Sequence, residues 1–190
     1  MQPRSRQILD AAAEAFHEHG FHGVGMDELG RRAGLSGSAL YRHFAGKDQI
    51  LAGLLDEALD ELATAAAVQL DDPRDDLARA LGHHVRFTVT HRHLVSVYQR
   101  ESRSLVEPYR NSFDRRRWRY VERWQILVAR RFPAMGTHEV AVLTQAILGT
   151  VFSMTSWPRR QADDAGVATL LTLLVGGIDA FDPRSDHPIP

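Results

Sequence analysis

The spacing of apolar residues constrains this chain of 190 residues more than any other feature of its sequence. Near the start, apolar side chains stand three or four positions apart, as they do on the buried face of a helix. These residues are Ile8, Leu9, Ala12, Ala13 and Phe16. Nearly every later segment also predicts a helix, and no segment shows a strand pattern or an internal repeat. We therefore predict an all-α fold.

Breaks in this pattern divide the first quarter of the chain into short helices. Gly20 ends the first predicted helix, and Gly34 ends a second one over 26–33. Ser36 is a side-chain cap for a third helix that runs to about Phe44. The later predicted helices cover 47 to about 70, 76–90, 94–104, 107–133, 137–157 with Thr137 as its cap, and 164–181.

The stretch GLSGSALYRHF, residues 34–44, joins the second and third predicted helices. Two helices joined by a turn of three or four residues can bind DNA, with the second helix in the major groove. Small residues at the start of that helix let its backbone approach the duplex, and hydroxyls there can bind base edges or phosphates. We therefore predict a helix–turn–helix with Leu40 and Phe44 buried. The spacing alone also fits an ordinary helix–loop–helix corner, which stays open at this point.

Several short motifs lie between residues 20 and 48. They are Gly20-Phe21, Glu28-Leu29, Ala33-Gly34-Leu35-Ser36, Leu40-Tyr41-x-His43-Phe44 and Lys47-Asp48. With these motifs, about the first quarter of the chain resembles the N-terminal domain of the TetR family of transcriptional regulators. The resemblance implies a three-helix DNA-binding domain over 1–46 and a helical domain for effector binding and dimerisation over 47–190.

The resemblance also implies which residues contact DNA. They are Ser36, Gly37, Ser38, Ala39, Tyr41, Arg42, His43 and Lys47. Tyr41 and His43 match the family's phosphate-contacting pair, and Lys47 matches a lysine that meets phosphate from the start of the fourth helix. Arg42 stands at a variable position, where we expect it to read guanine.

The motif region departs from the family pattern at three positions. Val24 stands where the family often has threonine, and Gly25 stands where it often has serine or threonine. A side-chain cap and a phosphate contact are therefore missing. Gly30 replaces the usual alanine, which slightly weakens its helix. Phosphate binding then depends more on other basic residues, namely Arg4, Arg6 and Lys47.

Charge is distributed in blocks, although the formal net charge is −1. From Arg79 to Arg131 there are 13 arginines against four acids, whereas 56–76 has eight acids and one arginine. Exposed arginines often only solvate a helix face. Arginine also favours bidentate contact with phosphate or carboxylate, so the basic block indicates an anionic ligand as well.

Residues 98–125 resemble the corresponding region of regulators of lipid and sterol catabolism that respond to acyl-CoA thioesters. An acyl-CoA would suit an apolar tunnel with an arginine-rich mouth, so we expect an anionic amphipathic effector, with acyl-CoA the leading hypothesis. The residues predicted to bind it are Arg100, Arg103, Arg116, Arg119, Trp118 and Trp124. For most aromatic residues of this region, core packing is the competing interpretation. The segment contains few acids that could neutralise a cationic drug, so a cationic effector is the less favoured alternative.

The last two predicted helices contain the very apolar segments 140–157 and 167–181. In the family the corresponding helices form a four-helix dimer interface, two from each subunit, so the resemblance implies a homodimer. Gly149, Gly176 and Gly177 would permit close helix approach there. The same apolar residues also fit the core of the monomer. The segment 183–190 is rich in proline and polar residues and predicts a disordered tail.

Several classes of site and function are not indicated by the sequence. The chain has no cysteine, no signal-peptide pattern and no apolar run of about 18 residues, so we expect a cytoplasmic protein without a membrane segment. Its ten histidines lack metal-ligand spacing, and no catalytic motif is present, so neither a metal, a cofactor nor an enzyme is predicted.

The sequence predicts a ligand-responsive transcriptional regulator, a repressor that binds a palindromic DNA operator as a dimer and is released by a small-molecule effector. The alternative is a helical ligand-binding module that keeps the helix–turn–helix as a scaffold without binding DNA.

Overall fold

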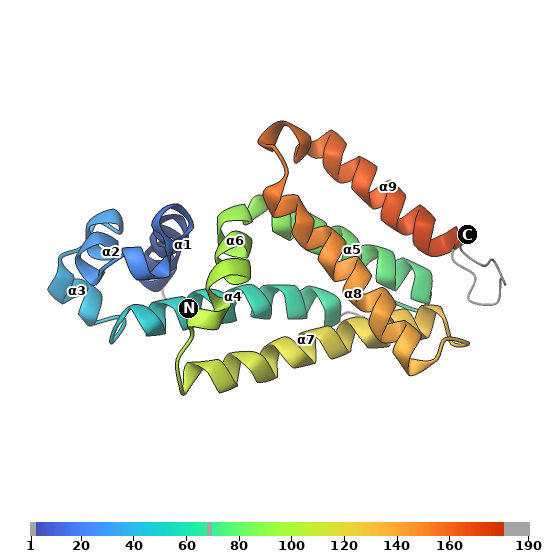
Figure 1. Ribbon diagram of the computed structural model, residues 1–190, viewed down its shortest axis with the longest axis horizontal. Helices are drawn as coiled ribbons and strands as arrows, with labels where there is room; N and C mark the ends of the chain where they lie inside the picture. Colours follow the sequence, from blue (N-terminus) through green and yellow to red (C-terminus); the bar gives the residue numbers. More distant parts are fainter. Residues whose placement is uncertain (1–2, 68–69, 181–190) are drawn as a thin grey trace. The chain divides into compact units, whose positions relative to one another are not determined.

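The computed structural model describes residues 3–67 and 70–180. Within these residues every regular element is an α-helix or a short 3-10 helix, so the predicted all-α fold is confirmed (Figure 1). The α-helices are α1 (Pro3–Gly23), α2 (Met26–Arg32), α3 (Gly37–Tyr41), α4 (Lys47–Ala67), α5 (Pro73–Thr90), α6 (Arg92–Glu101), α7 (Tyr109–Arg131), α8 (Thr137–Ser153) and α9 (Asp164–Ala180). The predicted tail at 183–190 and the predicted helix end at Phe181 lie outside the described residues.

Two compact units make up the chain. The first consists of Met1–Glu61 and His91–Arg119, and the second of Leu62–Thr90 and Tyr120–Pro190. Helices α4 and α7 each contribute residues to both units. The functional boundary between residues 46 and 47 stays a prediction, because it concerns which part binds DNA rather than how the chain packs.

In the first unit, α1 packs against α2 and α6, and α2 packs against α3. The largest core side chains are at most 1% exposed, and burying each contributes about 1.5–3 kcal/mol. They are Ile8, Leu9, Phe16, Leu29, Leu40, Ile50, Leu51 and Leu55. Helix α1 is interrupted at Gly20, whose φ of 71° lies in the left-handed region that favours glycine. Beyond this break, the Phe21 N–H donates to Glu101 Oε1 on α6 at 3.2 Å.

In the second unit, α5 packs against α8 and α9. Its interior is built from α5, α7 and α8, through buried side chains that include Leu81, Val85, Trp124, Leu127, Val128 and Val151. The carboxylate of Asp76 is also fully buried. It is paired with Arg79 at 3.1 Å and with Arg130 at 2.5 Å, which offsets the loss of its hydration.

Arginine side chains from α5 and α7 hold the C-terminal end of α4. The last carbonyl groups of a helix have no partner inside the helix and carry a partial negative charge. Arg79 donates to Ala65 O at 2.6 Å, and Arg123 donates to Ala66 O and Ala67 O at 2.8 and 3.0 Å. Arg130 reaches Leu70 O at 2.9 Å, just after the helix. Part of the basic block therefore ties the second unit together.

Two predicted helix boundaries are corrected by the structure. Helix α3 ends at Tyr41 rather than near Phe44, because the chain turns there. The N–H groups of His43 and Phe44 both donate to Leu40 O, so the turn still brings Phe44 into the core. Helix α8 is capped by Gly136 rather than Thr137 and ends at Ser153, where a 3-10 turn follows. The Gly136 N–H donates to Glu139 Oε2 at 2.7 Å, so an acid in the first turn supplies the cap.

One stretch of the described residues, Thr137–Ser156, is long and apolar enough by composition to cross a membrane, with a mean hydropathy of 1.2. This corrects the expectation that no apolar run reaches such a length. A single helix of this kind is weak grounds for a membrane segment, because core helices of soluble proteins have the same length and composition.

Candidate nucleic-acid interface and effector site

The turn between α2 and α3 is shaped by two glycines. Gly34 has a φ of 65°, a conformation that other residues adopt only with strain. After it the chain folds back on α2, and the Leu35 N–H donates to Gly30 O at 2.8 Å. A Cβ atom at Gly30 would lie 3.1 Å from Leu35 O, closer than most side chains tolerate. Gly30 therefore does more than weaken its helix, since it lets the turn pack against α2.

The start of α3 combines a cap with an open surface. Ser36 Oγ accepts a hydrogen bond from the Ala39 N–H at 3.2 Å, which confirms Ser36 as the helix cap. Ser36 and Ser38 are exposed and Gly37 is half-buried, so this side of the helix presents hydroxyls and bare backbone. Ala39 is only 9% exposed and lies toward the core beside Leu40.

The end of α3 carries the side chains that project farthest. Tyr41 is 56% exposed, Arg42 is exposed and His43 is half-buried. Leu40 and Phe44 anchor this segment in the core and are 0% and 9% exposed, as predicted. A phenol, a guanidinium and an imidazole that stand on an anchored turn are suited to hydrogen bonds with phosphates and base edges. Their contact with DNA stays a prediction.

Lys47 is engaged inside the first unit. Its Nζ donates to Phe21 O at 3.1 Å and to Val24 O at 3.3 Å, and it lies 4.6 Å from the centroid of the Phe21 ring. The lysine thus holds the segment that leads into α2, whose cap Gly25 provides no side-chain hydrogen bond. A phosphate contact by Lys47 stays a prediction, and it would be made by a side chain that also has this structural role.

Other basic residues of the first three helices are partly neutralised. Arg32 pairs with Glu28 and Glu18, each at 2.7 Å, and these bonds hold the pKa of both carboxyls below the usual range. Arg6 pairs with Glu57 at 2.9 Å, and Arg4 donates to Gln7 Oε1. The positive charge available to DNA from these helices is therefore small, and binding would depend on specific contacts.

The arginines predicted for the effector have different surroundings in the first unit. Arg100 donates to His17 O at 2.7 Å, and Arg116 pairs with Asp60 and with Asp56, the latter at 3.5 Å. Arg103 and Arg119 are exposed. Burial raises the pKa of Asp56, and the Arg116 charge opposes that shift.

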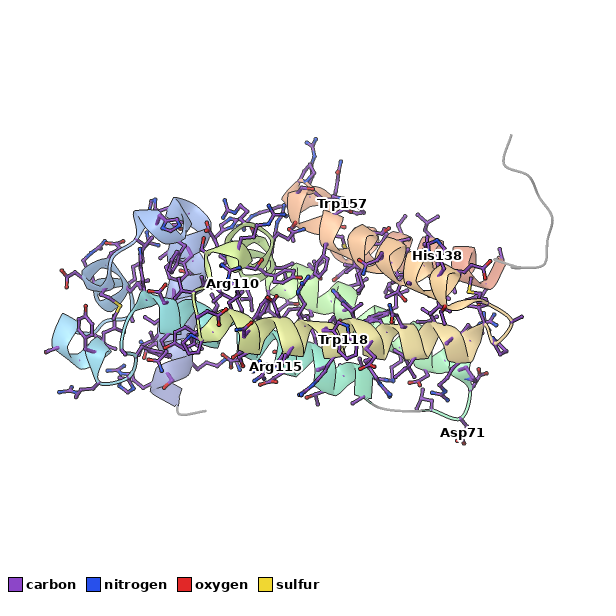
Figure 2. The ribbon with its side chains drawn as sticks, turned by 60° about the horizontal axis from the view of Figure 1, so that its bottom comes forward. Asp71, Arg110, Arg115, Trp118, His138 and Trp157 are labelled. Atoms are coloured by element: carbon purple, nitrogen blue, oxygen red, sulfur yellow. The ribbon has the colours of Figure 1, made fainter. Side chains whose placement is uncertain are left out.

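The two predicted effector tryptophans lie in opposite environments. Trp118 is 64% exposed on α7, near Arg115 (Figure 2). Trp124 belongs to the second unit and is 0% exposed. The six residues predicted for the effector thus fall into three groups. Arg103, Arg119 and Trp118 face solvent, Arg100 and Arg116 have partners within the first unit, and Trp124 is buried in the second unit. Whether they bind a common ligand stays a prediction.

Trp124 packs against a histidine that the sequence did not single out. The rings of His84 and Trp124 are 5.6 Å apart, and the His84 Nδ1 atom lies 2.6 Å from the Tyr120 hydroxyl. Burial, with a smaller effect of His83, lowers the pKa of His84 to about 3, so the ring is neutral. The spacing of Leu77, Leu81, His84 and Thr88 on one buried helical face was the signal that could have found it.

Among the described residues, no group of three or more histidine, aspartate or glutamate side chains is arranged to hold a metal ion. His17 and His93 do lie together, with ring centroids 4.5 Å apart in a stacked arrangement.

Two family models match this chain. Residues 8–54 match "Bacterial regulatory proteins, tetR family", and residues 70–161 match "Tetracyclin repressor-like, C-terminal domain". The first match contains the whole helix–turn–helix, and the second contains the His84 and Trp124 interior. Between them the two models cover most of the chain.

Individual relatives agree with these matches. The transcriptional activator FasR of Mycolicibacterium smegmatis is 37% identical over 76 residues, which are 40% of this chain and only 35% of that protein. The regulator PfmR of Thermus thermophilus has a structure with a TM-score of 0.79 at 26% identity, covering 92% of this chain and 96% of that one. The structure of AibR in complex with isovaleryl coenzyme A and operator DNA has a TM-score of 0.78 at 21% identity, over 92% and 97%.

Proposed function

We propose, since this chain belongs to the TetR family of bacterial transcriptional regulators, that it is a repressor which binds a palindromic operator as a homodimer and is released by a small-molecule effector. Regulators of this family are soluble DNA-binding proteins with a ligand-binding C-terminal domain. We place this one in the cytoplasm, where its operator would be.

The observation that carries the proposal is the surface formed by α3 and the turn after it. Ser36, Gly37 and Ser38 leave the start of the helix open, and Tyr41 and Arg42 project from its end. In the proposed complex the open start lies in the major groove. Tyr41, His43 and Lys47 then contact phosphates, and Arg42 reads guanine.

Dimerisation is supported by apolar side chains that stay open to solvent in the single chain. Val142 on α8 is 54% exposed and Leu173 on α9 is 66% exposed. A two-fold dimer reads a two-fold site, so the operator would be an inverted repeat with half-sites about 34 Å apart. Effector binding would favour a conformation in which the two α3 helices no longer match that spacing.

An acyl-CoA is the effector we propose. AibR, which shares the fold, was crystallised with isovaleryl coenzyme A, and the present chain carries exposed arginines at Arg103 and Arg119. In our proposal these arginines, with Arg100 and Arg116, meet the phosphates. Trp118 and Trp124, which belong to different units, are each proposed as an effector contact. Because FasR is a transcriptional activator, the sign of regulation has to be tested as well.

A gel-shift titration of the protein against DNA from upstream of its own gene tests DNA binding. We expect a salt-sensitive complex that Arg42→Ala weakens by about 10- to 100-fold, since a good contact to a base contributes about 1–3 kcal/mol. Arg160→Ala is the matched control, because it removes another exposed arginine, which belongs to the second unit. Octanoyl-CoA added to the complex should release the DNA.

A second candidate function is a helical ligand-binding module that keeps the helix–turn–helix as a scaffold. It is favoured by the engagement of Lys47 with backbone carbonyls and by the paired arginines Arg6 and Arg32. A folded dimer that binds octanoyl-CoA but no DNA at low salt would establish this alternative. If the protein binds DNA but activates transcription in a reporter assay, only the proposed repression would be wrong.

A further inference from the structure

The interior of the second unit contains polar atoms whose hydrogen bonds are not satisfied by the protein. Trp124 is 0% exposed, and no acceptor among the described residues pairs with its Nε1–H. His84 Nε2 and Thr88 Oγ1 likewise have no hydrogen-bond partner among the described residues, and their side chains are each 1% exposed. Buried polar atoms in proteins nearly always have a partner, so unpaired ones on neighbouring side chains point to a bound molecule, either a ligand or an internal water, as that partner.

These side chains form one cluster across three helices. The His84 ring lies 5.6 Å from Trp124 and 5.2 Å from Phe152, and the Tyr120 and Trp124 rings are 6.3 Å apart. Thr88 follows His84 by one turn of α5, so both face the same side of that helix. We call His84, Thr88, Tyr120, Trp124 and Phe152 the interior polar cluster. Its aromatic rings would surround a ligand with apolar surface.

The unpaired atoms are mainly donors. An indole nitrogen can only donate. Tyr120 and His84 Nδ1 are 2.6 Å apart, and the buried phenol proton finds its acceptor if Nδ1 receives it. We therefore assign the proton of the neutral imidazole to Nε2, which makes His84 a second donor.

The interior polar cluster has no charge to offer. His84 is neutral, because burial lowers its pKa. The buried carboxylate on the same helix, Asp76, is already paired with Arg79 and Arg130. Two buried neutral donors suit an uncharged acceptor, because a phosphate or carboxylate would lose its hydration here without gaining a counter-charge.

We propose that the interior polar cluster binds the carbonyl oxygen of an apolar effector, through Trp124 Nε1–H and His84 Nε2–H, with Thr88 Oγ1 as a further partner. This rests on the proposed function, which gives this part of the chain its effector-binding role. The ligand class is a ketone, ester or thioester flanked by hydrocarbon. Such a carbonyl can come from an acyl-CoA or from a free ketone, and the two sources are separated below.

The test is a calorimetric titration of the full-length protein with matched ligands. Octanoyl-CoA and S-octyl-CoA differ only in the carbonyl oxygen, which the second lacks. We expect octanoyl-CoA to bind at least about tenfold more tightly, because S-octyl-CoA leaves the buried donors unpaired. Octanoyl-N-acetylcysteamine and 2-decanone carry the carbonyl without the nucleotide. Tight binding of these two identifies a free carbonyl compound as the source, whereas binding of the CoA ester alone identifies the thioester.

Three variants assign the effect to the interior polar cluster. Trp124→Phe keeps a ring and removes the N–H, so the preference for octanoyl-CoA over S-octyl-CoA should fall several-fold, because His84 Nε2–H is the donor that remains. Trp157→Phe, the same change at a half-buried tryptophan outside the interior polar cluster, should leave the preference intact. Tyr120→Phe keeps the core volume and removes the hydroxyl that donates to His84 Nδ1. The imidazole proton is then no longer fixed on Nε2, so the preference should drop. This variant tests the proposal even if Trp124→Phe does not fold.

Equal affinity for octanoyl-CoA and S-octyl-CoA would overturn the proposal, as would a preference that Trp124→Phe and Tyr120→Phe both retain. Failure of every carbonyl ligand to bind would also overturn it and would leave internal water as the partner of these donors. None of these measurements involves DNA. A protein that binds its operator and is released by an effector with no carbonyl would therefore refute only this inference, whereas carbonyl-dependent binding without any DNA complex would refute the proposed function.

Discussion

His84 is an imidazole that stays uncharged far below neutral pH. Its burial removes the water that would stabilise the imidazolium, and within 3–67 and 70–180 no carboxylate pairs with the ring in place of that water, so its pKa falls to about 3. In the unfolded chain a histidine titrates near pH 6.5. The unfolded state therefore takes up a proton that the folded state refuses, and the stability contributed by neutral His84 is present above pH 6.5 and lost as the pH falls below it.

Stability should accordingly fall between pH 7 and pH 5, by about 2 kcal/mol from His84 alone. The measurement is urea unfolding at both pH values, for the native chain and for His84→Phe. The variant should be less stable at pH 7 but should lose about 2 kcal/mol less on acidification. His17, whose pKa burial also lowers, contributes in the same direction in both proteins and cancels in the comparison. Parallel losses in the two proteins would show that His84 is not protected from protons.

At the scale of elements, the end of α4 depends on side chains from other helices. Arg123 spans Ala66 O and Ala67 O with two nitrogens, while Arg79 takes Ala65 O. A guanidinium suits this position because it offers several donors in one plane and carries charge opposite to that of the helix end. The planar fork, rather than charge alone, makes the contact.

Arg123→Ala should therefore destabilise the protein by about 1–3 kcal/mol, since two charge-assisted hydrogen bonds are lost. Arg119→Ala, one turn earlier on α7 and exposed, should change stability by less than about 0.5 kcal/mol. Both values come from urea unfolding at one pH. If the two variants lost equal stability, the contacts at the end of α4 would contribute nothing beyond exposed charge.

The elements also show why sequence reasoning succeeded in part. Helical spacing is local information, so the all-α fold and the buried pair Leu40 and Phe44 could be predicted. The end of α3 could not, because four-residue spacing is equally satisfied by a turn that returns Phe44 to the core. The destinations of Arg79 and Arg123 could not be predicted either, because a backbone carbonyl leaves no trace in the sequence of its residue. The contacts of Lys47 with Phe21 O and Val24 O could not be predicted for the same reason, and the family resemblance assigns this lysine to a phosphate contact.

At the scale of the whole molecule, the exposed apolar side chains of α8 and α9 set the expected assembly. Leu173 is 66% exposed on a helix that also carries exposed Gly176 and Gly177, where a Cβ atom would meet nothing within 4 Å. Small residues beside an open leucine let a second helix approach closely, and covering such a face removes apolar surface from water.

Leu173→Arg should for this reason convert the proposed dimer to a monomer, measured by sedimentation velocity at micromolar protein concentration. Palindromic DNA should then be bound at least about 100-fold more weakly, because each monomer meets its half-site separately. Val106→Arg is the control, since it places the same charge on an exposed apolar position of the first unit. A Leu173→Arg protein that still sediments as a dimer would move the interface elsewhere.

The arginine contacts at the end of α4 also have a consequence for how the sequence can drift. A carbonyl oxygen is offered by every amino acid, so exposed Ala67 can be exchanged for other helix-forming residues without touching its bond, and at Ala66, 2% exposed, the core limits only the size of the side chain. Arg79 and Arg123 have no such freedom, because only a guanidinium reaches and divides itself between neighbouring carbonyls. Tolerance to mutation is thus distributed unequally across a single contact, with nearly all of it on the acceptor side.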